Sequence, residues 1–303
     1  MQKVTANGIT VSTEQLIMVG DKEKTICLDI LRLDQVDKEI SGNKIFKLHY
    51  YIEDAIKNKK RIVTFGGAFS NHLVATAALC HQHEIGCLGI VRGEPGGIRS
   101  HTLLKCENLG MELQFITREE YKRRNDPLNH VNPMDEYGDC VLIPEGGFGK
   151  NGMLGANLIT NYYPKGHYSH ICCVVGTATT LAGLVKNSDN HTQHIGYSAL
   201  KGLDDFEKRM QLLLDGDVQN NYILKKEFHF GGYAKTTPEL VTFMNHLYRE
   251  YTLKTDFVYT AKMMFGVFEM IKSNYFRAGS RILCIHTGGL QGNDSLPPGA
   301  LIF

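Results

Sequence analysis

The chain has 303 residues, of which 43% are hydrophobic and 21% charged, and its formal net charge is +1. This is ordinary globular composition, and the length allows one large domain or two lobes. Basic and acidic residues are interspersed, which disfavours a nucleic-acid-binding function. No apolar run is long enough to span a bilayer, and the segment Met1–Thr5 lacks the apolar core of a secretion signal. We therefore expect a cytoplasmic protein that binds neither nucleic acid nor membrane.

Eight cysteines are spread along the chain, and none forms a Cys-x-x-Cys pair. Several lie inside apolar segments such as Ile171–Val175, so we expect reduced, buried thiols rather than disulfides. The histidines are scattered too: His81 and His83 have no third ligand at a suitable spacing nearby. The sequence therefore predicts no metal site.

Short apolar strands alternate with helical stretches along most of the chain. In the first half, strands are expected at 61–65, 87–91, 112–116 and 140–143, with helices between them. The rhythm resumes after a glycine-rich segment at 146–152, with strands at 171–175, 194–197 and 281–285. This alternation predicts an α/β fold with parallel, doubly wound sheets.

The glycine-rich segment at 146–152 is the best boundary between two lobes. We expect a small α/β domain at 48–150 and a large domain made of 1–47 plus 151–303. Two such lobes imply a ligand in the cleft between them, at the carboxyl ends of the strands. The candidate motifs follow strand-like segments, as that geometry requires.

Lys44 follows Gly42-Asn43 and precedes an amphipathic helix. Most lysines are solvated surface charges. A lysine held at a helix start, beside backbone N–H groups and a second cation at Lys47, can instead have a lowered pKa and act as an imine-forming amine. From its spacing alone, Lys44 is a modest candidate for a Schiff-base lysine.

Ser70 and Asn71 follow Gly66-Gly67 where a strand meets a helix. Serine is a preferred helix N-cap, and on these residues alone that role is as plausible as a catalytic one. The two roles can coexist, because the positive field of a helix N-terminus favours an oxyanion.

The segment Gly176-Thr177-Ala178-Thr179-Thr180 follows a buried strand and opens a helix. Backbone N–H groups and hydroxyls at such a terminus form an anion pocket that suits a phosphate. The segment matches neither the P-loop nor the dinucleotide fingerprint, so a monophosphate cofactor fits best. A capped helix without a ligand explains these residues about equally well. Tyr233 and Tyr259, taken alone, would be read as packing residues.

Taken in order, these motifs resemble the pyridoxal-phosphate family of 1-aminocyclopropane-1-carboxylate (ACC) deaminase and D-cysteine desulfhydrase, which has the fold of the tryptophan synthase β subunit. The resemblance runs from about Leu28 to Gly292. Five motifs in the same order carry it: Ser41-Gly42-Asn43-Lys44, Gly66-Gly67-Ala68-Phe69-Ser70-Asn71-His72, Ile143-Pro144-Glu145-Gly146-Gly147, Val258-Tyr259-Thr260 and His286-Thr287-Gly288-Gly289.

The resemblance implies a role for each site residue. Lys44 would form the internal aldimine with pyridoxal 5′-phosphate, and Ser70 and Tyr233 would be the other catalytic groups. The remaining cofactor contacts would come from Lys47, Asn71, Gly176, Thr177, Ala178, Thr179, Thr180, Tyr259 and Thr260. Substrate contacts would come from Ser70, Asn71, His72 and Thr287. The family also suggests a homodimer.

One departure concerns the phosphate loop, where the family usually has two glycines and this chain has Ala178-Thr179. Side chains at these two positions could narrow or reshape the phosphate pocket.

The substrate depends on two positions. ACC deaminases resemble one another in having glutamate at the position of Thr260 and leucine at that of Thr287. The desulfhydrases have serine or threonine at the first of these positions and threonine at the second. A neutral hydroxyl would leave the cofactor's pyridine nitrogen largely unprotonated, which suffices when a thiolate leaves. We therefore expect α,β-elimination on a small amino acid such as D-cysteine, giving pyruvate, ammonia and sulfide. The alternatives are ACC deamination and, from another class, a non-catalytic pyridoxal-phosphate-binding protein.

Overall fold

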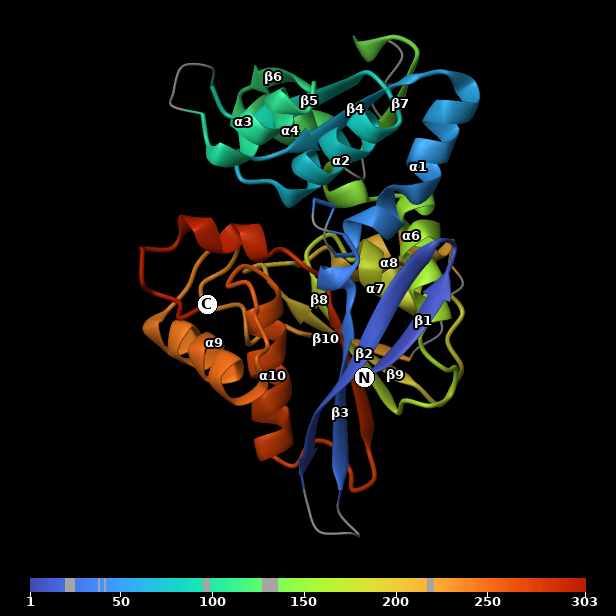
Figure 1. Ribbon diagram of the computed structural model, residues 1–303. Coiled ribbons are helices and arrows are strands. Elements are labelled where there is room, and N and C mark those ends of the chain that lie inside the picture. Colours follow the sequence, from blue (N-terminus) through green and yellow to red (C-terminus); the bar gives the residue numbers. More distant parts are fainter. Residues whose placement is uncertain (20–24, 38, 41, 95–98, 127–135, 217–220) are drawn as a thin grey trace.

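The computed structural model describes residues 1–303 except 20–24, 38, 41, 95–98, 127–135 and 217–220. Ser41, the first residue of the lysine motif, is thus outside the described residues. Two separate sheets organise the chain (Figure 1). Within the described part of the chain, no helix is long and apolar enough to cross a membrane.

The larger sheet has the strand order β1-β2-β3-β11-β8-β9-β10. Its parallel part joins β3 (Ile26–Arg32), β11 (Arg281–His286), β8 (His170–Val175), β9 (Gln193–Ser198) and β10 (Tyr222–Lys225). At one edge, β1 (Gln2–Ala6) and β2 (Ile9–Val19) form an antiparallel hairpin, and β2 also pairs antiparallel with β3.

The smaller sheet has the order β6-β5-β4-β7 and is parallel throughout. Its strands are β4 (Arg61–Gly66), β5 (Cys87–Arg92), β6 (Glu112–Ile116) and β7 (Cys140–Ile143). Helices α2 (Asn71–Gln82), α3 (His101–Asn108) and α4 (Arg118–Arg124) accompany this sheet (Figure 1). The strands expected at 61–65, 87–91, 112–116, 140–143, 171–175, 194–197 and 281–285 are present, and the expected mainly parallel α/β fold is confirmed. The expectation of a strand-like segment before Tyr259 is wrong, because the chain forms a turn there.

Helices cover both faces of the larger sheet. On one face lie α6 (Lys150–Asn157), α7 (Thr179–Lys186) and α8 (Phe206–Leu214), which share a core with side chains of β8 and β11. On the other lie α9 (Pro238–Tyr251) and α10 (Thr260–Lys272), which pack against alternate residues of the same strands. Short 3-10 turns follow β3, β7, α6 and β11, at Leu33–Gln35, Glu145–Gly147, Leu158–Tyr162 and Leu290–Ser295.

Helix α1 (Lys44–Asn58) connects the two cores. Its Phe46 packs into the core of the larger sheet, whereas Leu48, Tyr51 and Ile52 pack into the core of the smaller one. The helix therefore begins where the two sheets approach each other. The proposed domain limits at residues 47 and 150 stay a prediction.

Candidate active site

Strand ends from both sheets meet at one cavity of about 350 Å³. The smaller sheet contributes the last residue of β5 and the segments after β4 and β7, and the larger sheet contributes the segments after β8 and β11. The residues that line the cavity are Asn43, Lys44, Lys47, Ser70, Asn71, His72, Arg92, Glu145, Gly146, Val174, Gly176, Thr177, Ala178, Thr179, Thr180, Leu200, Arg209, Tyr233, Tyr259 and Thr287. Thirteen of the fourteen residues predicted for the site are thus together, and Thr260 is not among them.

Lys44 is the first residue of α1, and backbone contacts fix its position. Gly42 has φ +83°, and a Cβ there would lie 1.9 Å from the Thr287 carbonyl oxygen. The Asn43 N–H donates to that same carbonyl at 3.2 Å. Only glycine fits this close approach, so the lysine motif is docked on the end of β11.

The side chain of Asn43 links Lys44 to the 176–180 loop. The Lys44 Nζ donates to Asn43 Oδ1 at 2.9 Å, and Asn43 Nδ2 donates to the Thr180 hydroxyl at 2.7 Å. Burial lowers the pKa of Lys44 to about 8, and the Asp256 carboxylate opposes part of that shift. The sequence predicted the lowered pKa but attributed it to the helix terminus and Lys47, whereas burial is its main cause.

Two further basic side chains beside Lys44 are buried. Lys47 is 5% exposed, and burial together with repulsion from Lys44 holds its pKa well below the ordinary value. Burial lowers the pKa of His72 to about 3, with Lys47 and Lys44 adding to the shift, so its ring is neutral at physiological pH. The His72 Nε2 and the Thr64 hydroxyl are hydrogen-bonded at 2.8 Å. Neither side chain carries a negative charge, so this side of the cavity can accept an anionic ligand.

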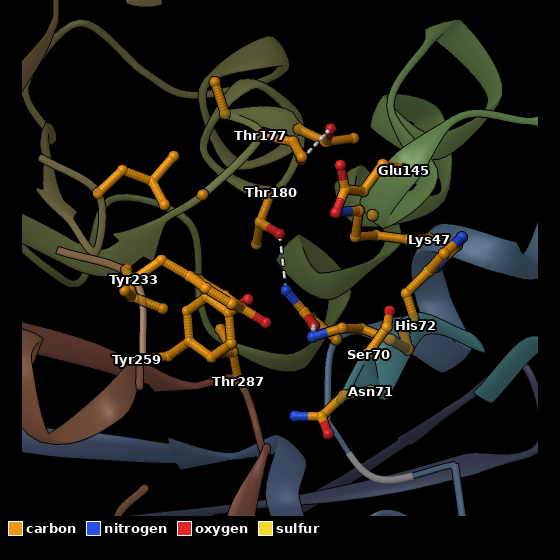
Figure 2. Close-up of a pocket in the computed structure, with 18 of the residues that line it drawn as sticks. Lys47, Ser70, Asn71, His72, Glu145, Thr177, Thr180, Tyr233, Tyr259 and Thr287 are labelled. Carbon is orange, nitrogen blue, oxygen red and sulfur yellow. Dashed lines mark hydrogen bonds between the residues drawn. The ribbon is translucent and has the colours of Figure 1, made fainter. Parts of the chain in front are cut away.

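The 176–180 loop lies between β8 and α7. Ala178 adopts a left-handed backbone, φ +68°, and among the described residues no side chain caps α7. The hydroxyls of Thr177 and Thr179 lie 2.9 Å apart (Figure 2). The residues that start α7 thus line the cavity, and three of them carry hydroxyls. That set of donors suits a phosphate-sized anion.

Ser70 and Asn71 stand at the junction of β4 and α2. The Ser70 hydroxyl accepts the Leu73 N–H at 3.3 Å, so the N-cap role holds, and the residue also lines the cavity. The Asn71 side-chain amide reaches toward the segment at Gly289, where a Cβ would lie 3.4 Å from its Nδ2. Both residues are therefore in reach of a cavity ligand.

Tyr233 and Tyr259 lie together on the wall opposite Lys47, Ser70 and His72 (Figure 2). Their rings are edge to face, with centroids 6.0 Å apart, and the Lys44 Nζ lies 5.7 Å from the centroid of the Tyr259 ring. Burial raises the pKa of both hydroxyls, so both stay protonated at neutral pH. They form an aromatic wall with protonated oxygens.

Thr260 lies behind this wall and is fully buried. Its hydroxyl donates to Asp256 Oδ1 at 2.6 Å and accepts the Asp256 N–H at 2.9 Å. Asp256 also accepts the N–H groups of Tyr259 and Thr260, and so caps α10. Burial raises the pKa of Asp256, and these donors oppose the rise. The structure thus brings Thr287, but not Thr260, to the cavity wall.

Sequence reasoning missed several charged and polar lining residues, among them Asn43, Arg92, Glu145 and Arg209. Arg92 ends β5 and Glu145 follows β7, so their place at carboxyl ends of predicted parallel strands was an available signal. Arg209 comes from the middle of α8, where nothing in its neighbours distinguishes it. Among the described residues, no group of three or more His, Cys, Asp or Glu side chains could hold a metal ion.

Comparisons with curated proteins give several relatives that span most of the chain, although no protein-family model matches it. The chain is 28% identical over 270 residues to a putative ACC deaminase of Thermotoga maritima, covering 83% of this chain and 85% of that protein. It is 29% identical over 294 residues to a mitochondrial bifunctional D-cysteine desulfhydrase/ACC deaminase of Arabidopsis thaliana, covering 87% of this chain and 72% of that protein.

Solved structures give the same result. The crystal structure of an ACC deaminase homologue matches with a TM-score of 0.72 at 25% identity, over 88% of this chain and 86% of that one. A pyridoxal 5′-phosphate-dependent aspartate racemase matches with a TM-score of 0.66 at 13% identity, over 95% and 92%, which shows a shared fold alone. The fold is therefore the tryptophan synthase β-like fold of type II pyridoxal-phosphate enzymes. Over most of its length the chain is thus similar to proteins named as ACC deaminase and D-cysteine desulfhydrase.

Proposed function

We propose that the chain is a pyridoxal 5′-phosphate-dependent lyase that eliminates the β-substituent of a small amino acid, D-cysteine first, to give pyruvate, ammonia and sulfide. The observation that carries the proposal is the arrangement around Lys44. The Lys44 amine is half-buried and its pKa is lowered to about 8. Asn43 links it by hydrogen bonds to Thr180 at the start of α7, which no side chain of the described residues caps. A cofactor with an aldehyde and a phosphate needs both features.

The residues present fit that cofactor. The 176–180 loop and Lys47 would hold the phosphate, Tyr259 would lie against the ring, and Asn71 would donate to its phenolic oxygen. The described residues that line the cavity include one carboxylate, Glu145, and four lysine or arginine side chains: Lys44, Lys47, Arg92 and Arg209. This balance favours an anionic ligand. When bound, the cofactor supplies an electron sink for charge that develops at the substrate's α-carbon.

The chain's own groups would then move protons. Lys44, with a pKa of about 8, can accept the α-proton, because a useful fraction of its amine is neutral near physiological pH. Tyr233 keeps its proton and is thus suited to donate one to a departing thiolate. The Ser70 hydroxyl can donate to the substrate carboxylate while it accepts the Leu73 N–H.

The first test is spectroscopic. With added pyridoxal 5′-phosphate, the purified protein should show the absorption of a lysine-bound cofactor at about 410–420 nm. Lys44→Ala should lose this band. Lys57→Ala, which changes an exposed lysine of the same helix, is the matched control and should keep it. A band that persists in Lys44→Ala would overturn the proposal.

The rate at which the cofactor attaches should depend on pH in a specific way. Only the neutral amine reacts, and the pKa of Lys44 is about 8 instead of 10.5. The attachment rate should therefore rise about tenfold per pH unit up to about pH 8 and then level off. Stopped-flow absorbance between pH 6 and 10 measures it. A midpoint near pH 10 would contradict the lowered pKa.

A substrate screen separates the candidate reactions. Release of 2-oxo acids from D-cysteine, D-serine and ACC should be fastest with D-cysteine. Faster turnover of ACC would favour the deaminase, and a bound cofactor without turnover of any small amino acid would favour a non-catalytic binding protein. A cytoplasmic location and a homodimer also stay predictions; sedimentation of the holo-protein tests the second.

A further inference from the structure

Besides Lys47, Lys262 is a second buried lysine near the cavity, and the proposed chemistry does not use it. It lies in the first turn of α10, three residues after Tyr259, and is 0% exposed. It is not among the residues that line the cavity. Its Nζ donates to the carbonyl oxygen of Gly232 at 2.6 Å.

Burying a lysine in this position destabilises the fold unless its amine has a hydrogen-bond acceptor. Burial lowers the pKa of Lys262 to about 8, and the Asp256 carboxylate partly opposes the shift. The Gly232 carbonyl is the acceptor that the structure provides. The bond therefore ties α10 to a segment 30 residues earlier in the chain.

That segment has an unusual backbone. Four of its five residues from 230 to 234 have positive φ: Phe230 at 50°, Gly231 at 91°, Gly232 at 109° and Ala234 at 51°. Such conformations are unfavourable for residues other than glycine and persist only when surrounding contacts stabilise them. Inside the segment, Gly232 N–H donates to His229 O at 3.0 Å and Lys235 N–H donates to Gly232 O at 3.2 Å. The Gly232 carbonyl thus joins the turn to Lys262.

The remaining residue of this segment is Tyr233, which lines the cavity although the residue is 43% exposed. It stands against Tyr259, the residue just before α10 (Figure 2). The Asp256 carboxylate accepts the backbone N–H of Tyr259. Lys262 donates to the Gly232 carbonyl in the turn that contains Tyr233. The start of α10 therefore sets the relative position of the two hydroxyls.

We propose that Lys262 is a positioning residue that fixes the Tyr233 hydroxyl in the cavity through the Gly232 carbonyl. The proposal rests on the proposed function only in that Tyr233 serves there as an active-site hydroxyl. Lys262 itself touches neither substrate nor cofactor. Its effect on turnover must pass through Tyr233.

The first experiment needs neither cofactor nor turnover. Lys262→Met keeps the apolar stem and removes the donor, and Gly232 O keeps the Lys235 N–H, so the variant should fold. In the cofactor-free protein we expect amide hydrogen exchange at Gly232 and Lys235 to become about tenfold faster, as for the loss of one hydrogen bond. Lys272→Met, at an exposed lysine paired with Glu269 on the same helix, is the control and should change neither amide. Unchanged exchange in Lys262→Met would overturn the proposal.

The second experiment is a double-mutant cycle on the holoenzyme. Lys262→Met should lower kcat about tenfold with little change in KM, and Lys262→Arg should restore part of it. In the Tyr233→Phe background, Lys262→Met should cause no further loss. Additive losses, or a Tyr233→Phe variant with full activity, would overturn the positioning role. If Lys262→Met does not fold, Lys262→Leu, which also lacks a donor, takes its place with the same expectations. Faster exchange in a protein that turns over no amino acid would refute the proposed function and leave the anchoring intact.

Discussion

Two strand-to-helix junctions face the same cavity and begin their helices differently. After β4, Ser70 has an extended backbone and its own hydroxyl accepts the Leu73 N–H, so α2 is capped internally. After β8, Ala178 has a left-handed backbone, and no side chain of the described residues caps α7. Local stability explains the first junction. The second leaves backbone donors free at a strained residue, which local stability does not explain.

The difference indicates which of the two junctions we expect to bind an anion. A capped helix start has used one of its free N–H groups, whereas an uncapped one offers them all, with the positive end of the helix dipole behind them. Ser70 can still take part in chemistry, but its residue type is already justified by folding. The 176–180 loop also brings the hydroxyls of Thr177, Thr179 and Thr180 to the cavity, a set of donors that suits an anion.

The largest effect should come from giving α7 a charged cap of its own. Asp tolerates the left-handed backbone of Ala178, and its carboxylate would occupy the helix start and repel a phosphate. We expect Ala178→Asp to weaken pyridoxal 5′-phosphate binding about 100-fold, measured by fluorescence titration.

Ala178→Asn is the matched control, because it can cap the helix without the charge. It should weaken binding less than Ala178→Asp, and thermal unfolding of both variants should show a folded protein. Equal binding by Ala178→Asp and the native protein would mean that the phosphate sits elsewhere, and the contrast between the two junctions would then have no functional meaning.

Much of this cavity wall could be predicted because its residues follow the carboxyl ends of apolar strands. Strand signals such as those at 61–65 and 171–175 are strong, and parallel strands bring their carboxyl ends to one edge. Glycine turns then identify the junctions. The hairpin β1–β2 escaped detection, since it lies at a sheet edge and mixes polar with apolar residues.

The groups behind the wall could not be predicted, because their meaning depends on burial and on distant partners. Asp256 lies in the polar segment Lys254-Thr255-Asp256, which resembles an ordinary loop, yet it is fully buried. Thr260, which was expected to contact the cofactor, instead donates its hydroxyl hydrogen bond to Asp256. Lys262 finds its acceptor 30 residues away. A lysine between apolar residues was the available signal, but it did not identify Gly232.

An intermediate effect is expected at the capped junction. Ser70→Ala removes the acceptor for the Leu73 N–H and should lower the free energy of unfolding by about 1 kcal/mol, measured by urea denaturation. Ser70→Thr keeps a capping hydroxyl and should retain most of this stability. If Ser70 is only a cap, turnover will follow the fraction of folded protein. A loss of kcat in Ser70→Ala that Ser70→Thr restores would instead show that the hydroxyl also acts on the substrate.

The smallest effect should appear at Ala178 itself. A left-handed backbone costs a non-glycine residue about 1–2 kcal/mol, while glycine loses about 0.5–1 kcal/mol more conformational entropy on folding. Ala178→Gly, at φ +68°, should therefore stabilise the protein by about 0.5 kcal/mol. Ser70→Gly, at φ −78°, should have the opposite sign, because no strain is relieved and the cap is lost. Paired urea denaturations measure both. Destabilisation by Ala178→Gly would show that packing of the Ala178 methyl group contributes more than its backbone strain costs. Backbone strain would then no longer distinguish the α7 junction from the α2 junction.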